Sequence, residues 1–267
     1  MSTFTHGIVR TVSRSLADCQ LTHLPRQQFD LPLAARQHQS YVETLLSTGV
    51  RVTVLPEEPT LPDAVFVEDT AVILGELIVV CRPGCANREP EVETIIPVLT
   101  GLRNLVRMQS PGTLDGGDVL AIDKTLFVGV SGRTNGEGLR QLQAITRGFG
   151  YRVIPVTSRG CLHLKTAVTC VAPGVLLVNP DWVDITPFAG FELLATPKGE
   201  PWSANTLPVN KVVLTLASSL RTIDLLQSKR LNVRPVDISE LQKAEAGLTC
   251  LSLLYRQPGW SIAVEKR

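Results

Sequence analysis

The chain has 267 residues and a formal net charge of +1 at pH 7, with 44% hydrophobic and 19% charged residues. This composition predicts a soluble globular protein with a sizeable core, and it argues against disorder and against an electrostatic footprint for nucleic acid or an anionic membrane. No apolar run approaches the length of a membrane span and the N-terminus lacks a signal-peptide pattern, so we predict a cytoplasmic protein.

Predicted helices and strands follow one another in a repeating order along the chain. The helical patterns cover 34–49, 89–102 and 136–150, with shorter candidates at 181–188 and 219–230. Apolar runs predict strands at 51–56, 64–74, 76–81, 105–108, 118–122, 125–131, 151–157, 166–172, 175–179, 211–217, 232–238 and 250–255. Each hairpin is followed by a helix, a single strand and a polar turn, and segment 5–13 fits the opening of the first unit.

The hairpins open at regular intervals. Five landmark residues, 42 to 48 residues apart, mark these openings: Asp69, Asp115, His163, Asn205 and Cys250. A fixed period of this size is typical of a repeat architecture, and five units can close into a ring. We therefore predict an α/β fold, a five-bladed pseudo-symmetric propeller of ββαβ units, in which the landmark side chains meet at the centre.

The landmark residue types suit nucleophilic catalysis. Cys250 is a candidate nucleophile, His163 a proton donor and acceptor, and Asp115 the group that orients the imidazole. Taken alone, each has an ordinary structural interpretation as a buried thiol, a core histidine or a paired acid. We expect His163 to lie within an apolar strand. We expect residues 114–120 to form a strand that points Asp118 to the opposite face from Asp115, in a structural role.

Acidic residues near the first landmark indicate a cationic substrate. Asp63, Glu68 and Asp69 lie within seven residues, and carboxylates bind a planar guanidinium through paired hydrogen bonds. An amino-acid substrate would also need a cation for its carboxylate, and the candidates are Arg82, Arg88 and Arg133. The other cysteines, Cys19, Cys81, Cys85, Cys161 and Cys170, form neither a dense disulfide pattern nor a C-x-x-C motif. We expect no metal and no cofactor.

Six segments carry a resemblance to a known family: ARQHQSYVETL, LPDAVFVEDTAV, TLDGGDVL, VGVSGRTN, LHLKTAVT and GLTCLSLL. They resemble the dimethylarginine dimethylaminohydrolases of the guanidino-group-modifying (pentein) superfamily, over nearly the whole chain and least across 180–230. The resemblance implies a single catalytic domain over 1–267, a five-bladed α/β propeller, that hydrolyses asymmetric dimethylarginine and monomethylarginine to citrulline and a methylamine.

The resemblance also implies a role for each matching residue. Cys250 would be the nucleophile, His163 the proton donor and Asp115 the third member of the triad. The implied substrate contacts are the guanidinium-side acids Glu68 and Asp69, the amino-acid-end residue Asp63, the carboxylate-binding Arg88 and Arg133, the backbone of a covering loop at Leu21, and the carbonyl of Ala244. Mammalian members have a second cysteine where this chain has Leu251, and the loop around 21–33 matches poorly.

Three alternatives stay open at this stage. One is a compact arginine deiminase or another hydrolase of guanidino substrates, although deiminases and amidinotransferases are generally longer. The second is a non-catalytic pentein that binds a partner, which would have no need for this set of cysteine, histidine and acids. The third is a zinc site made of Cys250, His163 and Asp115, for which no fourth ligand has a suitable spacing. Nothing in the sequence separates a monomer from a homodimer.

Overall fold

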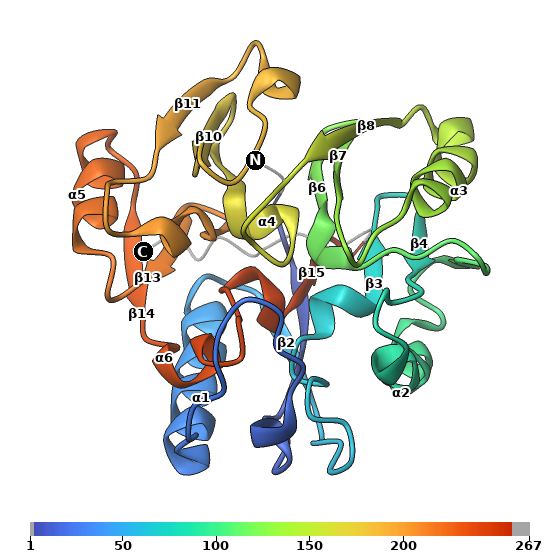
Figure 1. Ribbon diagram of the computed structural model, residues 1–267, viewed down its shortest axis with the longest axis horizontal. Coiled ribbons are helices and arrows are strands. Elements are labelled where there is room, and N and C mark those ends of the chain that lie inside the picture. Colours follow the sequence, from blue (N-terminus) through green and yellow to red (C-terminus); the bar gives the residue numbers. More distant parts are fainter. Residues whose placement is uncertain (1–2, 258–267) are drawn as a thin grey trace, which may run out of the picture.

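Five small sheets surround a common centre in the computed structural model, which describes residues 3–257 (Figure 1). Each sheet has three strands, in the orders β3-β4-β5, β6-β7-β8, β9-β10-β11, β12-β13-β14 and β15-β1-β2. In every sheet the first strand is antiparallel to the middle strand and the third is parallel to it. The predicted five-unit, propeller-like α/β fold is confirmed.

The elements of the five units have the following bounds. The strands are β1 His6–Arg10, β2 Arg51–Leu55, β3 Ala71–Ile73, β4 Leu77–Val80, β5 Asn104–Arg107, β6 Val119–Ile122, β7 Thr125–Val130, β8 Arg152–Thr157, β9 Val168–Ala172, β10 Val175–Val178, β11 Glu192–Ala195, β12 Leu207–Val209, β13 Val212–Leu216, β14 Val233–Val236 and β15 Leu253–Tyr255. The helices are α1 Leu31–Ser47, α2 Glu89–Leu99, α3 Gly136–Thr146, α4 Leu164–Ala167, α5 Leu220–Ser228 and α6 Ser239–Gln242.

The two ends of the chain close the ring. β1 pairs with β15 on one side, His6 opposite Tyr255, and with β2 on the other, His6 opposite Arg51. The N-terminal strand β1 is therefore the middle strand of the sheet β15-β1-β2. We expected the N-terminal segment to be the first strand of a unit. Such pairing is non-local, and the sequence pattern of one strand does not reveal its partner.

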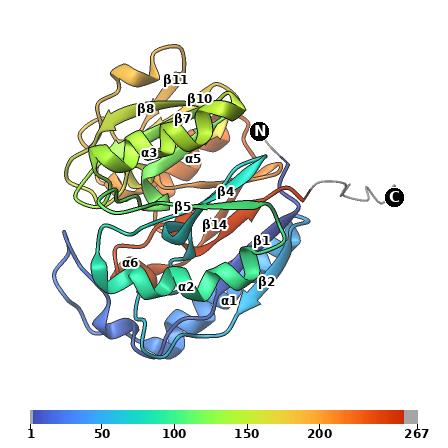
Figure 2. The same ribbon diagram turned by 90° about the vertical axis from the view of Figure 1, so that its right-hand side faces the viewer.

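Four of the five predicted helices are present, and they lie on the outside of the ring. Figure 2 shows α2 and α3 on the outer side of the strands. The helix expected at 181–188 is wrong, because only the short 3₁₀ turn Thr186–Phe188 forms there. Val183 and Phe188 are the residues of that segment that are buried, and they are too far apart to make a continuous apolar helix face. None of the helices in the described part of the chain is long and apolar enough to cross a membrane.

A single helical turn precedes the first strand of every sheet, and in four of the five sheets the sequence predicted strand over at least part of that turn. These turns are Val67–Thr70, Gly116–Asp118, α4, Pro201–Ala204 and Thr249–Leu251. A short apolar run has the same pattern in a buried strand and in a buried turn, so the sequence could not distinguish them. The turns matter for the site because neighbouring ones contact each other around the centre.

Helix α1 joins the outer layer to one of these turns. It begins at the cap Asp30, whose carboxylate accepts a hydrogen bond from the Leu33 amide at 2.8 Å, and its buried face includes Ala34, Tyr41 and Leu45. The Tyr41 hydroxyl lies 3.1 Å from the carbonyl oxygen of Leu248 and 2.7 Å from Oγ of Ser252. These bonds hold the segment around Cys250 from both of its sides.

Candidate active site

The five landmark residues all lie at the central turns, but they do not share one position in the repeat. Asp69 and Cys250 lie inside their turns, Asp115 and His163 directly precede theirs, and Asn205 directly follows its own. The regular spacing of these residues therefore correctly predicted that they lie at the centre of the ring. It predicted their positions within the repeat only to within a few residues. These differences in register give each side chain its own direction of approach.

Asp115 and His163 form a direct pair. Nε2 of His163 lies 2.9 Å from Oδ2 of Asp115, and both side chains are almost completely buried. The other carboxylate oxygen of Asp115 accepts a hydrogen bond from the Gly84 amide at 2.9 Å. Both oxygens of the carboxylate are thus held, which fixes the orientation of the imidazole that binds it.

Asp69 occupies the opposite side of the same imidazole. Its Oδ1 lies 3.7 Å from Nδ1 of His163 and accepts a hydrogen bond from the Gly117 amide at 2.9 Å. Its Oδ2 accepts from Arg88 Nη1 at 2.7 Å. The imidazole consequently lies between two carboxylates that come from different units of the ring.

The paired glycines of residues 114–120 permit this close packing. A Cβ atom on Gly117 would lie 2.6 Å from Nδ1 of His163, and one on Gly116 would lie 1.9 Å from the carbonyl oxygen of Glu68. Neither distance is possible for a real side chain, so both positions require glycine. The Gly-Gly pair is therefore explained by the contact between turns rather than by a hairpin.

The surrounding charges favour the protonated imidazole. Burial opposes the charged form, but the negative charge of Asp69, the hydrogen bond that the imidazole donates to Asp115 and the charge of Asp118 together raise the pKa of His163 to about 9. Burial likewise opposes ionisation of Asp69, yet His163 and Arg88 outweigh it and hold its pKa well below the usual range. At neutral pH the site therefore contains an imidazolium between carboxylates.

We expected Asp118 to lie on the opposite face of a strand from Asp115, and this is wrong. It belongs to the turn Gly116–Asp118, and its Oδ1 accepts a hydrogen bond from the Leu164 amide at 2.9 Å. Its Oδ2 accepts from the Ser131 hydroxyl at 2.6 Å. The chain winds into a turn here, so a three-residue separation brings Asp118 to the same region as Asp115. Its bonds hold the backbone next to His163, which agrees with a structural role.

Cys250 is buried in the turn Thr249–Leu251, with 8% of its surface exposed. Its Sγ accepts a hydrogen bond from the Gly247 amide at 3.3 Å. Burial and the nearby charges of Glu68 and Asp69 raise the pKa of the thiol to about 12. In the absence of a bound cation, the site therefore keeps this cysteine in its thiol form.

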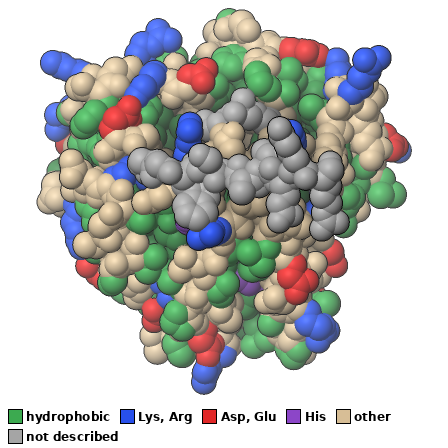
Figure 3. All heavy atoms as spheres, turned by 180° about the vertical axis from the view of Figure 1, so that it is seen from behind, with side chains coloured by type: hydrophobic (Ala, Val, Ile, Leu, Met, Phe, Trp, Pro, Cys, Tyr) green, Lys and Arg blue, Asp and Glu red, His purple; other side chains and the backbone are tan. Residues whose placement is uncertain are grey.

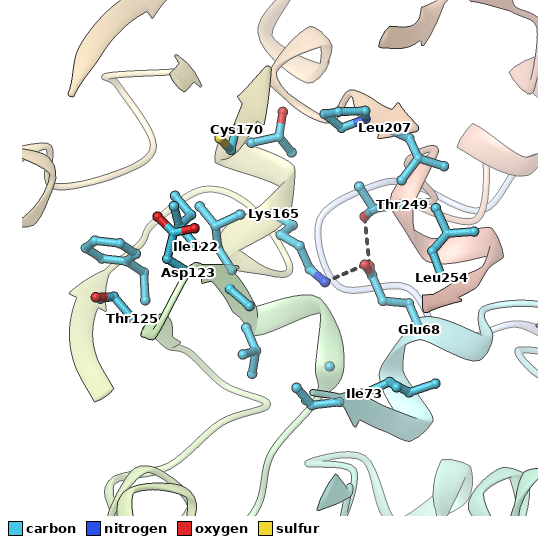
Figure 4. Close-up of a pocket in the computed structure, with 18 of the residues that line it drawn as sticks. Glu68, Ile73, Ile122, Asp123, Thr125, Lys165, Cys170, Leu207, Thr249 and Leu254 are labelled. Atoms are coloured by element: carbon cyan, nitrogen blue, oxygen red, sulfur yellow. Dashed lines mark hydrogen bonds and ion pairs between the residues drawn. The ribbon is translucent and has the colours of Figure 1, made fainter. Parts of the chain in front are cut away.

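Glu68 is the centre of a polar network that the sequence did not predict. Its carboxylate accepts from Lys165 Nζ and, at 2.7 Å, from the Thr249 hydroxyl, and Figure 4 shows both side chains pointing toward it. Asn205 accepts a hydrogen bond from the Thr249 amide at 3.1 Å and donates to the Lys165 carbonyl oxygen at 2.9 Å. The sequence offered one indication that Lys165 and Thr249 belong to the site, which is their proximity to candidate residues. Lys165 follows His163 by two residues, and Thr249 is adjacent to Cys250.

The same three residues, Glu68, Lys165 and Thr249, line a cavity of about 760 Å³ (Figure 4). The rest of its lining is largely apolar and includes Phe127 and Leu207. Asp115, His163 and Cys250 are not part of its lining. This network therefore belongs both to the cavity wall and, through Thr249, to the segment that carries the cysteine.

The predicted carboxylate-binding arginines have different surroundings. Nη1 of Arg133 lies 3.7 Å from Oδ2 of Asp115 and makes no hydrogen bond with the described residues. Arg88 is buried and donates to Asp69, to both oxygens of Glu91 and to two backbone carbonyls. Arg133 therefore has donors available for a ligand, whereas Arg88 is largely occupied.

The residues expected at the amino-acid end come together near the N-terminal loop. The Asp63 carboxylate accepts a hydrogen bond from the Gln20 amide at 3.0 Å, next to Leu21. Ala244 is buried, and its neighbour Glu245 contacts the backbone on the other side of Leu21. The structure thus places Leu21, Asp63 and Ala244 in one region.

One group of side chains in the described part of the chain could hold a metal ion: Asp69, Asp115 and His163, whose ligand atoms lie within 4.8 Å of one another. These atoms already bind each other, Arg88 and backbone amides. The group does not include Cys250, so the zinc site considered from the sequence is not the cluster that the structure assembles.

Comparison with known proteins connects this geometry to a family. Residues 25–186 match the family model described as N,N dimethylarginine dimethylhydrolase, eukaryotic. The N(G),N(G)-dimethylarginine dimethylaminohydrolase of Pseudomonas aeruginosa is 33% identical over 94% of this chain and 100% of its own length. The enzyme of the same name from Streptomyces coelicolor is 36% identical over 94% of this chain and 97% of its own.

The structural comparison agrees. A dimethylarginine dimethylaminohydrolase from Pseudomonas aeruginosa, solved as a mutant complexed with citrulline, superposes with a TM-score of 0.91 at 32% identity, covering 95% of this chain and 100% of that one. The fold and sequence define a guanidino-group-modifying protein of the pentein type. Within that class, the chain belongs to the dimethylarginine dimethylaminohydrolase family.

Proposed function

We propose that this protein hydrolyses arginine methylated on its guanidinium, releasing citrulline and a methylamine, and that residues 1–267 form one catalytic domain. The observation that carries the proposal is the buried pair of Asp115 and His163, placed at the centre of the ring to which Cys250 also belongs. Family membership supplies the substrate class, and these three side chains supply a nucleophile, a proton donor and its orienting acid.

The charges of the site account for binding of a cation. Glu68 and Asp69 are buried carboxylates that can pair with a guanidinium. At the other end of the substrate, Arg133 has donors available for the carboxylate and Asp63 provides a negative charge for the ammonium group. Arg88 could reach a substrate only by giving up one of its present partners, so we assign it mainly to holding Asp69.

A bound cation would also activate the nucleophile. The same carboxylates that hold Cys250 as a thiol are neutralised when a guanidinium binds, which favours the thiolate. The thiol proton passes to solvent, and the thiolate then forms a bond to the guanidinium carbon. His163 donates its proton to the leaving nitrogen, the carbon–nitrogen bond breaks, and the amine departs.

Water completes the reaction. The neutral imidazole left after proton donation can accept a proton from water, which attacks the carbon of the thiouronium intermediate. Breaking the carbon–sulfur bond releases citrulline and restores the thiolate of Cys250. His163 keeps one proton of the water, and the other passes to solvent, where the released amine takes it up. Asp115 stabilises the imidazolium at the beginning and end of this cycle.

We further propose that the protein is cytoplasmic, that it acts as a monomer or a homodimer, and that it has no nucleic-acid or membrane partner. The near-zero net charge supports the last of these, because binding to nucleic acid or an anionic membrane usually requires a basic surface. On the face shown in Figure 3, basic and acidic side chains are interspersed around the rim. Analytical ultracentrifugation would distinguish a monomer from a homodimer.

The experiment that tests the proposal is steady-state citrulline release from a panel of substrates. Asymmetric dimethylarginine and monomethylarginine should be hydrolysed, and unsubstituted arginine poorly. If arginine is the best substrate, the protein is a compact deiminase. If no guanidino compound yields citrulline, the non-catalytic alternative replaces the proposal.

A further inference from the structure

A buried glutamate holds the N-terminal loop of the chain. Oε1 of Glu245 accepts hydrogen bonds from the amides of three consecutive residues, Thr22 at 3.0 Å, Leu24 at 2.6 Å and His23 between them. Glu245 is 5% exposed, and its Oε2 is buried without a hydrogen-bond partner among the described residues. A buried carboxylate is costly unless it receives hydrogen bonds, so these loop amides stabilise it strongly.

The backbone conformation at Glu245 indicates that its side chain has a role at this position. Its φ angle is +61°, in the left-handed region that favours glycine. A turn that served only to end the α6 segment would be satisfied by glycine. Retaining a glutamate there has a conformational cost, and the three loop amides are the contacts that this glutamate makes.

A second carboxylate holds the loop just before the first. The amide of Gln20 donates to Asp63 at 3.0 Å, and the amide of Thr22 donates to Glu245. Leu21 lies between these two anchored residues. The backbone on both sides of Leu21 is therefore fixed. Asp63, in the segment between β2 and β3, holds the residue before it, and Glu245, which follows α6, holds the residue after it.

We propose that Glu245 is a positioning residue that closes loop 20–24 over the amino-acid end of the substrate. The inference rests on the proposed function for the location of that end, at Leu21, Asp63 and Ala244. It adds a residue that carries no substrate contact of its own. Loss of the Glu245 carboxylate releases the loop amides, and a substrate must then order the loop when it binds. KM therefore rises while the chemical step is little affected.

Glu240 provides a matched control. It lies on the same segment, is also buried, and its Oε2 accepts a hydrogen bond from the Asp30 amide at 2.9 Å. Lys243 contacts both of its oxygens. Glu240→Gln removes a buried carboxylate that holds the chain beyond the loop, so its effect should be confined to the region of Asp30.

Amide hydrogen exchange and steady-state kinetics on the full chain test the proposal together. In Glu245→Ala, exchange at residues 22–24 should accelerate about tenfold or more, and KM for asymmetric dimethylarginine should rise about tenfold with kcat within about twofold, because bonds to a charged acceptor are lost. Glu245→Gln, which keeps an uncharged acceptor, should be intermediate. Glu240→Gln should leave both readouts at the wild-type level, and core amides should stay protected in all variants.

Unchanged exchange at residues 22–24 in Glu245→Ala, or a fall in kcat with KM unaltered, would overturn the proposal. The exchange measurement needs no substrate. If the wild-type protein releases no citrulline, the proposed function fails on its own, and the exchange data still decide whether Glu245 holds the loop.

Discussion

Nε2 of His163 is 2.9 Å from Oδ2 of Asp115, although the two residues are 48 positions apart and belong to adjacent units of the ring. Asp69 lies on the other side of the imidazole at 3.7 Å. A histidine held between two buried carboxylates is poised as a proton donor, which is the property that the proposed amine-releasing step requires.

Asp115→Asn should lower kcat on the order of a hundredfold or more while leaving substrate binding and the fold intact. The Gly84 amide requires an oxygen at one position of the side chain, so the amide nitrogen of the variant would face His163 and disfavour the imidazolium. Single-turnover kinetics should show slower release of the amine.

Asp118→Asn should act on stability instead. The Ser131 hydroxyl donates a hydrogen bond to Asp118, and its oxygen already accepts hydrogen bonds from the amides of Arg133 and Thr134. An asparagine nitrogen would place a donor against this donor, at a cost of about 1–3 kcal/mol in the free energy of unfolding. Denaturant melts and kcat should be measured for both variants; inactivation by Asp118→Asn with little effect of Asp115→Asn would reverse the assignment.

Arg133→Ala and Asp69→Asn should have different kinetic signatures. Arg133 is proposed to bind the substrate carboxylate equally in the ground and transition states, so its loss should raise KM with kcat little changed. Asp69 faces the imidazole, so its loss should also lower kcat. Steady-state kinetics with asymmetric dimethylarginine distinguish the two, and identical profiles would contradict the proposed orientation of the substrate.

The raised pKa of His163 predicts a pH-dependent contribution to stability. The folded protein favours the imidazolium, with a pKa of about 9 against 6.5 for the free group. This contribution is therefore complete below about pH 6.5 and is lost as the pH rises through about 9. The difference in Tm between wild type and His163→Gln should shrink over that interval, and a difference that grows with pH would show the opposite shift.

The sequence predicted the ring because its period appears in every unit, independently of which strands pair. It also singled out the cysteine, histidine and acids as candidates, because their residue types limit their chemistry, and the structure places them at the central turns. It could not predict that the apolar runs before β3, β6 and β9 wind into turns. Asp118 was consequently assigned to the wrong side of its segment.

Contacts between distant segments were also beyond the sequence. The contact between the Tyr41 hydroxyl and Oγ of Ser252 spans 211 positions. The bond from the Thr22 amide to Glu245 spans 223 positions. Such contacts follow from closure of the ring, which non-local strand pairing sets.

Covalent hydrolysis through Cys250 can be observed by intact-protein and peptide mass spectrometry after acid quench. During turnover of asymmetric dimethylarginine, we expect an adduct equal in mass to the substrate minus dimethylamine on the peptide that contains Cys250. The adduct should be absent in Cys250→Ser, which should release no citrulline. Sustained citrulline release by Cys250→Ser, or an adduct on another cysteine, would contradict covalent hydrolysis through Cys250.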